Sequence, residues 1–333
     1  MMEGWQYGLL LNLENKLPTR ALHDLVTLPG QKPVISYGPP GYSASLAAPG
    51  FLGRYLVSKL ARMGTQVVVP YRDEDEKRHL KPMGDLGQIV SMEWDIRNEG
   101  QIAECLRHSD IVYNLVGRDY ETKNFKFADV HVTGAERIAK RLVHVSHLNA
   151  SANGEERVRS VFPNVTVVRP ATMFGYEDKL LNNMATWPIW WKLNFGETKI
   201  RPVHVIDVAQ ALANLMSTPQ LTRTVSLPGP STLTYEYLLE LVASVTYRAP
   251  SRAPVVPKPI ALAVARAAQM AWWPLINPDE VERRFIDDAN VPGDWNVVGV
   301  CPDEVENHAI TYLRRYRLAK DYPRPVLFPA RPT

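Results

Sequence analysis

Short apolar runs and amphipathic stretches alternate along the first half of the chain, and this alternation predicts strands and helices in turn. The apolar runs predict six strands, at residues 42–46, 66–72, 88–95, 110–117, 142–148 and 166–175. Apolar residues at helical spacing predict helices at 54–61, 99–107, 125–141 and 155–162. Strands that alternate with helices predict an α/β fold with a Rossmann-type doubly wound parallel sheet.

The second half of the chain is mainly helical. We expect Asp207 to cap a helix, and residues 223–227 to return a strand to the main sheet. Three further helices are predicted, at 234–247, from Asn277 onward and at 302–317. The domains expected are an N-terminal extension (1–41), a Rossmann domain with interleaved segments (42–230) and a smaller C-terminal helical region (231–333).

A glycine turn, residues 47–53, joins the first predicted strand to its helix. Glycines let the backbone approach a pyrophosphate, and the N-terminus of the next helix offers free N–H groups. Gly50 and Gly53 occupy two of the three usual glycine positions, whereas Ala47 stands at the first. The turn predicts an NAD(P) site, although similar turns also occur in structural helix caps.

The end of the second predicted strand indicates which dinucleotide is bound. An acidic residue there would hold the ribose 2′-OH of NAD, but Arg72 stands in its place. A cation suits the 2′-phosphate of NADP, and Arg54 could add a second positive contact. The alternative is that both arginines are solvated surface charges.

Later strands also end in candidate cofactor residues. Asp95 ends the third strand, where it could meet the adenine or cap the following helix. Val116 and Gly117 end the fourth strand, and glycine there permits close approach of the cofactor. We expect Ser146, on the fifth strand, to pack beside the ligand rather than to act as a catalytic hydroxyl.

Composition narrows the classes of function. The chain has 333 residues, 45% of them hydrophobic and 22% charged, with a net charge of +3 at pH 7. No run of lysine and arginine suggests a nucleic-acid groove. Cys105 and Cys301 form no metal spacing, so we expect no metal site and a reducing compartment. No apolar run reaches the roughly 20 residues that span a bilayer.

Five stretches of the chain together resemble one family. They are residues 51–55 (Phe-Leu-Gly-Arg-Tyr), 83–88 (Met-Gly-Asp-Leu-Gly-Gln), 114–125 (Asn-Leu-Val-Gly-Arg-Asp-Tyr-Glu-Thr-Lys-Asn-Phe), 144–150 (His-Val-Ser-His-Leu-Asn-Ala) and 169–178 (Arg-Pro-Ala-Thr-Met-Phe-Gly-Tyr-Glu-Asp). From about Thr19 to the C-terminus, the chain resembles the 39/40-kDa accessory subunits of mitochondrial NADH:ubiquinone oxidoreductase (respiratory complex I), the fungal ones most.

The resemblance implies an atypical short-chain dehydrogenase fold that holds NADPH tightly, without turnover, and supports assembly or stability of the complex. It implies other complex I subunits as partners, and a peripheral position on the matrix side of the mitochondrial inner membrane. Within the matching stretches, Phe51, Leu52, Pro170 and Phe174 are expected to complete the cofactor site.

The chain departs from this family in four places. The glycine turn lacks its first glycine, helix 125–141 runs into the fifth strand without a loop, only residues 151–162 precede the sixth strand, and the N-terminus does not resemble a presequence. Short-chain dehydrogenases carry a Tyr-x-x-x-Lys pair after the fifth strand, in which the lysine lowers the tyrosine pKa. Residues 151–162 contain neither, so we expect no catalytic residue, and His204 is expected to be structural.

Residues 260–276 form an apolar segment near the middle of the C-terminal region. Arg266 and Pro274 argue against a helix that spans a membrane. Trp272 and Trp273, with cations before the segment, suit a bilayer interface or a partner subunit. We expect docking through this segment, and a buried core helix is the alternative.

Three functions therefore remain. The sequence favours a non-catalytic, NADPH-binding accessory subunit of complex I. An active NADP-dependent short-chain oxidoreductase is the second possibility, and the missing Tyr-x-x-x-Lys pair argues against it. An interaction protein that binds no cofactor is the third, and the altered glycine turn keeps it open.

Overall fold

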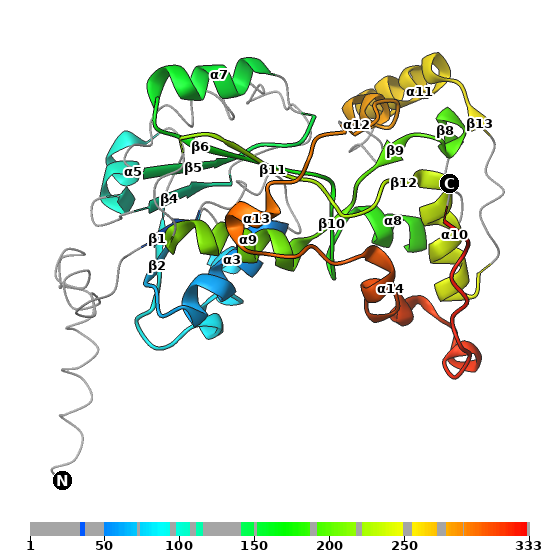
Figure 1. Cartoon of the computed structure of the whole chain (residues 1–333), viewed down its shortest axis with the longest axis horizontal. Coiled ribbons are helices and arrows are strands. Elements are labelled where there is room, and N and C mark those ends of the chain that lie inside the picture. The colour runs from blue at the N-terminus through cyan, green and yellow to red at the C-terminus, as the bar shows by residue number, and fades with distance from the viewer. Residues whose placement is uncertain are drawn as a thin grey trace, which may run out of the picture.

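The computed structural model describes most of the chain from residue 50 onward, together with one short strand before it (Figure 1). The described residues are 34–36, 50–71, 74–93, 98–106, 111–115, 141–149, 152–186, 192–217, 222–248, 255–271, 278–288 and 290–331. The predicted strand 42–46 and residues 125–140 of the predicted helix 125–141 lie outside these ranges, and Arg141 begins a strand instead of ending that helix. Also outside these ranges lie Ala47, Arg72, Asp95, Val116, Gly117, Trp272, Trp273 and Asn277.

A seven-stranded sheet forms the centre of the N-terminal half, in the order β11-β6-β5-β4-β1-β2-β3, and each neighbouring pair is parallel. Its strands are β1 (Val34–Ser36), β2 (Val67–Tyr71), β3 (Ile89–Glu93), β4 (Ile111–Asn114), β5 (Arg141–Val145), β6 (Thr166–Pro170) and β11 (Thr224–Leu227). The strand order reverses at β1, which lies between β2 and β4. This arrangement confirms the predicted doubly wound parallel sheet, and β11 confirms the predicted return of residues 223–227.

The first strand is not where the sequence pattern placed it. Strand β1 occupies Val34–Ser36, within the segment that we expected to lie over the domain as an extension, rather than residues 42–46. Val34 and Ile35 are β-branched residues that favour a strand. Three residues are too few to show a period, and the glycines and prolines on either side favoured a prediction of turns.

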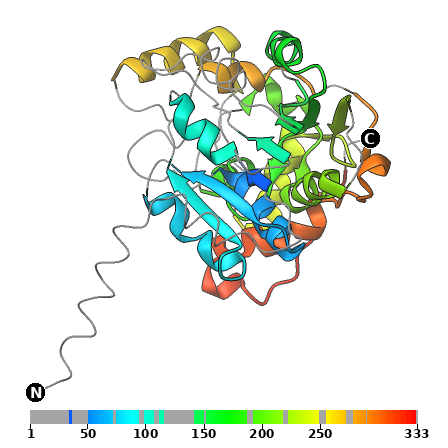
Figure 2. The ribbon, with the colours of Figure 1, turned by 90° about the vertical axis from the view of Figure 1, so that its left-hand side faces the viewer.

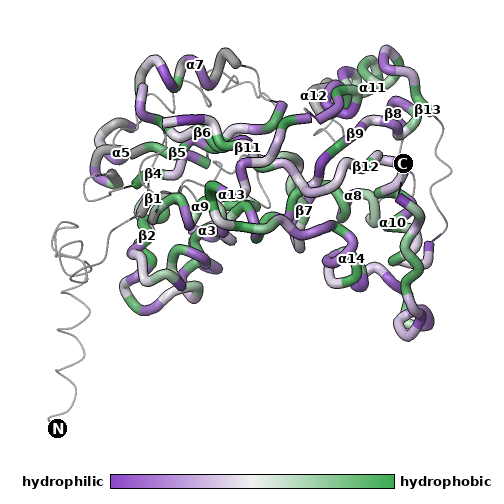
Figure 3. The backbone as a smooth tube through the Cα atoms, viewed as in Figure 1, coloured by the Kyte–Doolittle hydropathy of each residue, from purple (hydrophilic) through white to green (hydrophobic). Residues whose placement is uncertain are grey.

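Helices cover both faces of the sheet. On one face lie α3 (Phe51–Arg62) and α9 (Val205–Ser217), which pack against each other, and on the other lies α7 (Ala152–Val161) (Figure 1). Helices α4 (Glu74–Arg78) and α5 (Glu99–Leu106) are shorter connections between strands. Figure 3 shows that α9 is largely hydrophobic, and its apolar side chains belong to the core that it shares with the sheet and α3.

Two helix starts differ from the prediction. Helix α3 begins at Phe51, directly after Gly50, so Gly53 lies in its first turn rather than before it. Helix α9 begins at Val205, which places Asp207 in the first turn and not at the cap. The Asp207 carboxylate instead accepts a hydrogen bond from the backbone N–H of Asp303 at 2.8 Å. A tertiary partner therefore uses the carboxylate that the sequence pattern assigned to a local cap.

Elements from both sides of residue 231 form the rest of the molecule, which packs a second core beside the sheet. Its helices are α8 (Leu180–Thr186), α10 (Tyr235–Thr246), α11 (Lys258–Ala271), α12 (Pro278–Arg283), α13 (Trp295–Val298) and α14 (Val305–Leu313). Three two-stranded sheets pair β7 (Met173–Phe174) with β10 (Val203–His204), β9 (Lys199–Ile200) with β12 (Leu233–Thr234), and β8 (Lys192–Leu193) with β13 (Val255–Val256). Helices α8, α10 and α14 enclose this second core.

Helix α11 lies at one end of the molecule and the α3–β2 region at the other. Figure 1 shows this separation along the longest axis of the molecule, and Figure 2 looks along that axis from the β2 side. Across the described ranges, none of the helices combines the length and apolarity needed to cross a bilayer.

Candidate functional site

The first turn of α3 forms one wall of the candidate cofactor site. Gly50 precedes the helix in an extended conformation, and the backbone N–H of Gly53 donates to the Gly50 carbonyl at 2.8 Å. Glycine has no side chain with which to cap a helix, so no side-chain acceptor at this position competes for the first N–H groups. A helix start without a side-chain cap suits an anion such as a phosphate.

The turn that follows β7 packs directly onto this helix start. A Cβ added at Gly175 would lie 2.7 Å from Cγ1 of Val205 and 2.9 Å from Cζ of Phe51. Only glycine fits so close to both side chains. The Phe51 ring also meets Tyr55 edge to face, with the ring centroids 5.7 Å apart. The turn directly after Phe174 is thus brought against the predicted cofactor segment 50–54.

Arg54 is already engaged within the protein. Its guanidinium forms an ion pair with the Glu177 carboxylate, which the turn after β7 supplies. The Arg54 charge also acts on His79, whose pKa is lowered by burial and by this guanidinium. A neutral His79 therefore lies close to the cation, and its buried Nε2 atom has no partner among the described residues. The sequence analysis missed His79, which follows α4 in a strongly charged stretch.

The carboxyl end of β2 adds another cation to this corner. Strand β2 ends at Tyr71, and the Lys77 ammonium donates to the Tyr71 hydroxyl at 2.8 Å and lies 4.0 Å from the centre of its ring. Arg72 is the next residue after Tyr71 along the chain. Lys77, which also pairs with Glu74, thus lies at the strand end where a Rossmann fold reads the adenosine ribose, and Arg72 is adjacent to it in sequence.

Ser146 is part of a buried polar network behind β5. Its backbone N–H donates to the Val168 carbonyl at 2.8 Å, and its hydroxyl donates to the Glu155 carboxylate. Arg169 binds the same carboxylate in a bidentate manner, at 2.8 Å through Nε and 2.6 Å through Nη2. Burial alone would raise the pKa of Glu155, but the hydrogen bonds from Arg169 and Ser146 outweigh it and hold this pKa below its usual value.

Three other predicted contacts are more deeply placed. The Leu52 side chain belongs to the core beneath the sheet. The Pro170 carbonyl, at the end of β6, accepts a hydrogen bond from the Leu148 N–H at 3.0 Å. The Phe174 ring is fully buried and stacks on His204 with the ring centroids 5.2 Å apart. Phe174 therefore lies behind the surface that a ligand could touch in this arrangement.

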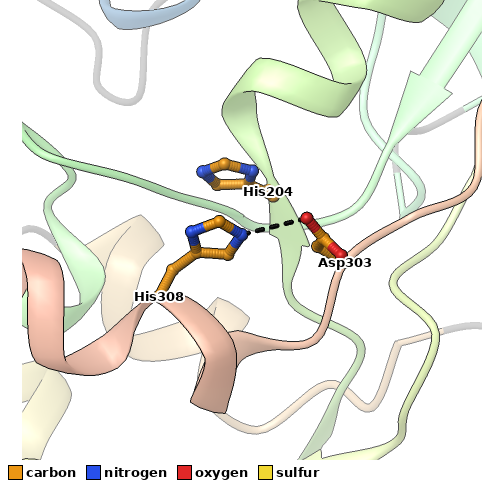
Figure 4. Close-up of side chains that lie close together, drawn as sticks. All are labelled: His204, Asp303 and His308. Carbon is orange, nitrogen blue, oxygen red and sulfur yellow. Dashed lines mark hydrogen bonds and ion pairs between the residues drawn. The ribbon is translucent and has the colours of Figure 1, made fainter.

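His204 joins β10 to α14 through a cluster of rings (Figure 4). Its Nε2 atom lies 2.7 Å from the hydroxyl of Tyr312, and its ring stacks on His308 at 4.0 Å between centroids. Asp303 binds Nε2 of His308 at 3.1 Å. Burial and nearby acidic groups raise the pKa of Tyr312 to about 12, so this phenol is neutral at physiological pH. His204 is thus a buried residue whose contacts hold β10 against α14.

This cluster meets a distance criterion for metal binding but not a directional one. Ligand atoms of His204, Asp303 and His308 lie within 4.8 Å of one another. The two imidazole planes are only 18° from parallel, and imidazole donates to a metal through a lone pair in its ring plane. Two stacked rings cannot both aim these lone pairs at one ion, so this arrangement is a packing contact. Sequence spacing gave no signal for Asp303 and His308.

Known proteins share both the sequence and the fold. The NAD dependent epimerase/dehydratase family matches residues 48–153. Solved structures with the same fold include the Citrobacter triphenylmethane reductase complexed with NADP(H), with a TM-score of 0.60 at 14% identity over 85% of this chain and 99% of that one. An epimerase from Methanothermobacter thermautotrophicus gives a TM-score of 0.62 at 11% identity over 90% and 96% of the two chains. At these identities the likeness shows the fold alone.

Two curated relatives carry the closer similarity. The mitochondrial NADH-ubiquinone oxidoreductase 40 kDa subunit of Neurospora crassa is 42% identical over 92% of this chain and 89% of its own. The rat NADH dehydrogenase (ubiquinone) 1 alpha subcomplex subunit 9 is 38% identical over 81% of this chain and 79% of its own. The resemblance seen in the motifs therefore extends along nearly the whole sequence, and the chain belongs to this family of mitochondrial complex I accessory subunits.

Proposed function

We propose that the chain is a non-catalytic accessory subunit of mitochondrial complex I that holds NADPH as a structural cofactor. The observation that carries the proposal is the 42% identity over 92% of the chain to a complex I subunit. The subunit would sit at the inner membrane on its matrix side and support assembly or stability of the complex. A ligand that binds only the folded chain stabilises it by mass action, which gives the cofactor a role without turnover.

The choice of NADPH rests on the corner between α3 and β2. The uncapped first turn of α3 suits the pyrophosphate, and the cations at the carboxyl end of β2 suit a 2′-phosphate. Arg72 follows this strand, while Arg54 shares its charge with Glu177. Arg72 is therefore the main phosphate ligand in this proposal, and Arg54 orders the turn that closes the site.

Calorimetry on the purified chain tests this assignment. Arg72→Asp should weaken NADPH binding by about 1.5–3 kcal/mol, the size of a hydrogen bond to a charged group, and should favour NADH relatively. Arg78→Asp is the matched control, because Arg78 is exposed and pairs only with its neighbour Asp75 among the described residues. Equal NADPH affinity in wild type and Arg72→Asp would contradict the proposal. Absence of any bound nicotinamide in wild type would favour the cofactor-free alternative.

The absence of turnover rests on two features of the β5 edge. Residues 151–162 offer neither the tyrosine nor the lysine of a dehydrogenase pair. The Ser146 hydroxyl is committed to the Glu155 carboxylate. We expect no steady hydride transfer to a panel of ketones and sugar nucleotides. Turnover that Ser146→Ala abolishes would instead establish an active oxidoreductase.

Helix α11 supplies the proposed docking face toward the membrane or a membrane-arm subunit. It buries Ala261 and Ala265 against α12, while Ile260 and Val264 on its outer side are 55% and 42% exposed. Exposed apolar side chains one turn apart suit contact with lipid or protein. Ile260→Glu with Val264→Glu should release the subunit from membranes at an unchanged melting temperature. Retention of the double mutant would reject this face.

A further inference from the structure

The loop between η1 (Lys81–Met83) and β3 holds a fully exposed leucine. Leu86 is the most exposed large apolar side chain in the described part of the chain. It lies in the Met-Gly-Asp-Leu-Gly-Gln stretch at 83–88, and none of the proposed cofactor or membrane contacts uses it. Leu86 contributes nothing to the core, so its whole side chain is available for a contact outside the chain.

The loop is built to keep its shape. The Gln88 side chain is buried, accepts a hydrogen bond from the Asp85 N–H at 2.9 Å and donates to the Ala61 carbonyl at 2.7 Å. The buried Gln66 amide donates to the Gly87 carbonyl at 3.2 Å. Two buried glutamines thus tie both sides of Leu86 to the protein.

Both glycines beside Leu86 are required by this geometry. A Cβ at Gly84 would lie 2.7 Å from Oε1 of Gln88 and 3.2 Å from Cβ of Ala61. Gly87 has φ of +80°, in the left-handed region that side chains disfavour. The leucine is therefore presented in one fixed position. A preformed loop loses little conformational entropy on binding, which favours affinity.

The surroundings of Leu86 are apolar next to the loop and mainly cationic around it. Met63, two residues after the Ala61 contact, is 42% exposed at the end of α3. Arg62 and Lys81 are exposed on the two elements that carry the loop, and Asp85 is the one acidic group within it. A matching surface would be apolar at its centre and acidic at its rim.

We propose that Leu86 is a docking anchor that inserts into an apolar pocket, bordered by carboxylates, on a partner protein of the complex. A single leucine on a rigid turn matches a pocket, whereas a lipid surface is bound through a broad apolar face such as that of α11. The α3–β2 end and α11 lie at opposite ends of the molecule (Figures 1 and 2). The chain would thus bind one partner through Leu86 and a different surface, at its other end, through α11. This inference rests on the proposed role as a subunit.

Binding of the full-length chain to complex I that lacks it tests the anchor. Leu86→Ala should weaken the affinity about 10- to 100-fold, as expected for one buried leucine, and Leu86→Asp should abolish measurable binding. Arg62→Glu should weaken binding further as it opposes the acidic rim. Leu327→Asp is the matched control, because Leu327 is also strongly exposed, at 81%, but lies outside this loop. The affinity of the Leu327→Asp variant should equal that of wild type.

The other outcomes each decide the question. Wild-type affinity in Leu86→Asp would overturn the anchor while leaving the subunit role intact, whereas failure of wild type to bind would overturn the subunit role itself. Loss of flotation with phosphatidylcholine–cardiolipin vesicles in Leu86→Asp, but not in Leu327→Asp, would assign the loop to lipid and overturn the proposal. A lowered melting temperature in Leu86→Asp would show that the leucine packs in the fold, with the same consequence.

Discussion

At the scale of single residues, two carboxylates show how burial and hydrogen bonding compete. Glu155 and Asp178 are both only 4% exposed. Glu155 meets the Arg169 guanidinium, and its pKa falls. Burial raises the pKa of Asp178 to about 6, despite the hydrogen bonds that it accepts from backbone N–H groups and the nearby charge of Arg315. The partners of Glu155 could not be read from the sequence, because Arg169 lies on β6 and Ser146 follows β5, whereas those of Asp178 are within four residues of it.

Glu155→Gln should destabilise the fold by about 1–3 kcal/mol, because it removes a charge-assisted pair and leaves the Arg169 charge partly buried. A depressed carboxyl pKa gives stability that is complete above the unfolded value of about 4.5 and is lost as pH falls through the folded value. The gap between wild type and variant in urea unfolding should therefore close in acid. Glu156→Gln, its exposed neighbour on α7, should leave stability unchanged at every pH.

Asp178 should give the opposite dependence. A raised pKa means that the folded state keeps its proton between about 3.8 and about 6, so stability falls as pH rises through this window and is constant above it. At about 1.4 kcal/mol per unit, the loss amounts to roughly 2–3 kcal/mol. Asp178→Asn should show a flat profile over the same window. A parallel decline in both proteins would show that another group titrates.

At the scale of elements, the sequence predicted the buried strands well and the helix starts less well. The ends of β2 to β6 and β11 fall within five residues of the predicted ones, because long β-branched runs carry a clear signal. Strand β1 was missed because three residues show no period. Asp207 was misassigned as a cap because its partner, the Asp303 N–H, is 96 residues away in the chain.

Gly229 shows why one loop after β11 accepts no side chain. A Cβ there would lie 1.8 Å from the Pro202 carbonyl oxygen, a backbone atom that cannot move aside. Gly229→Ala should cost about 3 kcal/mol or more and lower the melting temperature by several degrees. Gly299→Ala should cost only about 1 kcal/mol, because its φ is +65° but the space around it is open. Similar melting temperatures for the two variants would contradict this distinction.

At the scale of the whole molecule, the C-terminal region is fastened over the carboxyl edge of the sheet. Asn149, after β5, donates to the Asp288 carboxylate at 3.0 Å. The same carboxylate accepts a hydrogen bond from the backbone N–H of Arg201 at 2.8 Å. The backbone N–H of Asp288 in turn donates to the backbone carbonyl of Lys199 at 2.8 Å. The sequence predicted that the two regions interleave but not these contacts. They join exposed and half-buried polar residues that follow no pattern along the chain.

Asp288→Ala should remove the hydrogen bonds from Asn149 and Arg201 to this carboxylate without exposing core side chains. We expect faster amide hydrogen exchange in residues 278–300 and around Asn149. NADPH binding should weaken as well where the cofactor contacts the segment that Asp288 holds against Asn149. Asp287→Ala is a partial control, because its carboxylate accepts only from the Lys199 N–H among the described contacts, at 2.8 Å. Unchanged exchange in Asp288→Ala would show that packing alone holds the region.

The late position of β11 has a consequence for synthesis of the chain. The strand that completes the sheet begins at residue 224. The Ser226 N–H on this strand donates a hydrogen bond at 2.9 Å to the carboxylate of Asp294, which follows Ser226 by 68 residues. Trp295, which donates to the Pro228 carbonyl at 2.8 Å, emerges with it. A growing polypeptide therefore carries an unfinished sheet with an open edge until almost all of it has left the ribosome. Chaperones would have to cover that edge during elongation, and premature stop codons well upstream of residue 294 would leave a nascent product that aggregates.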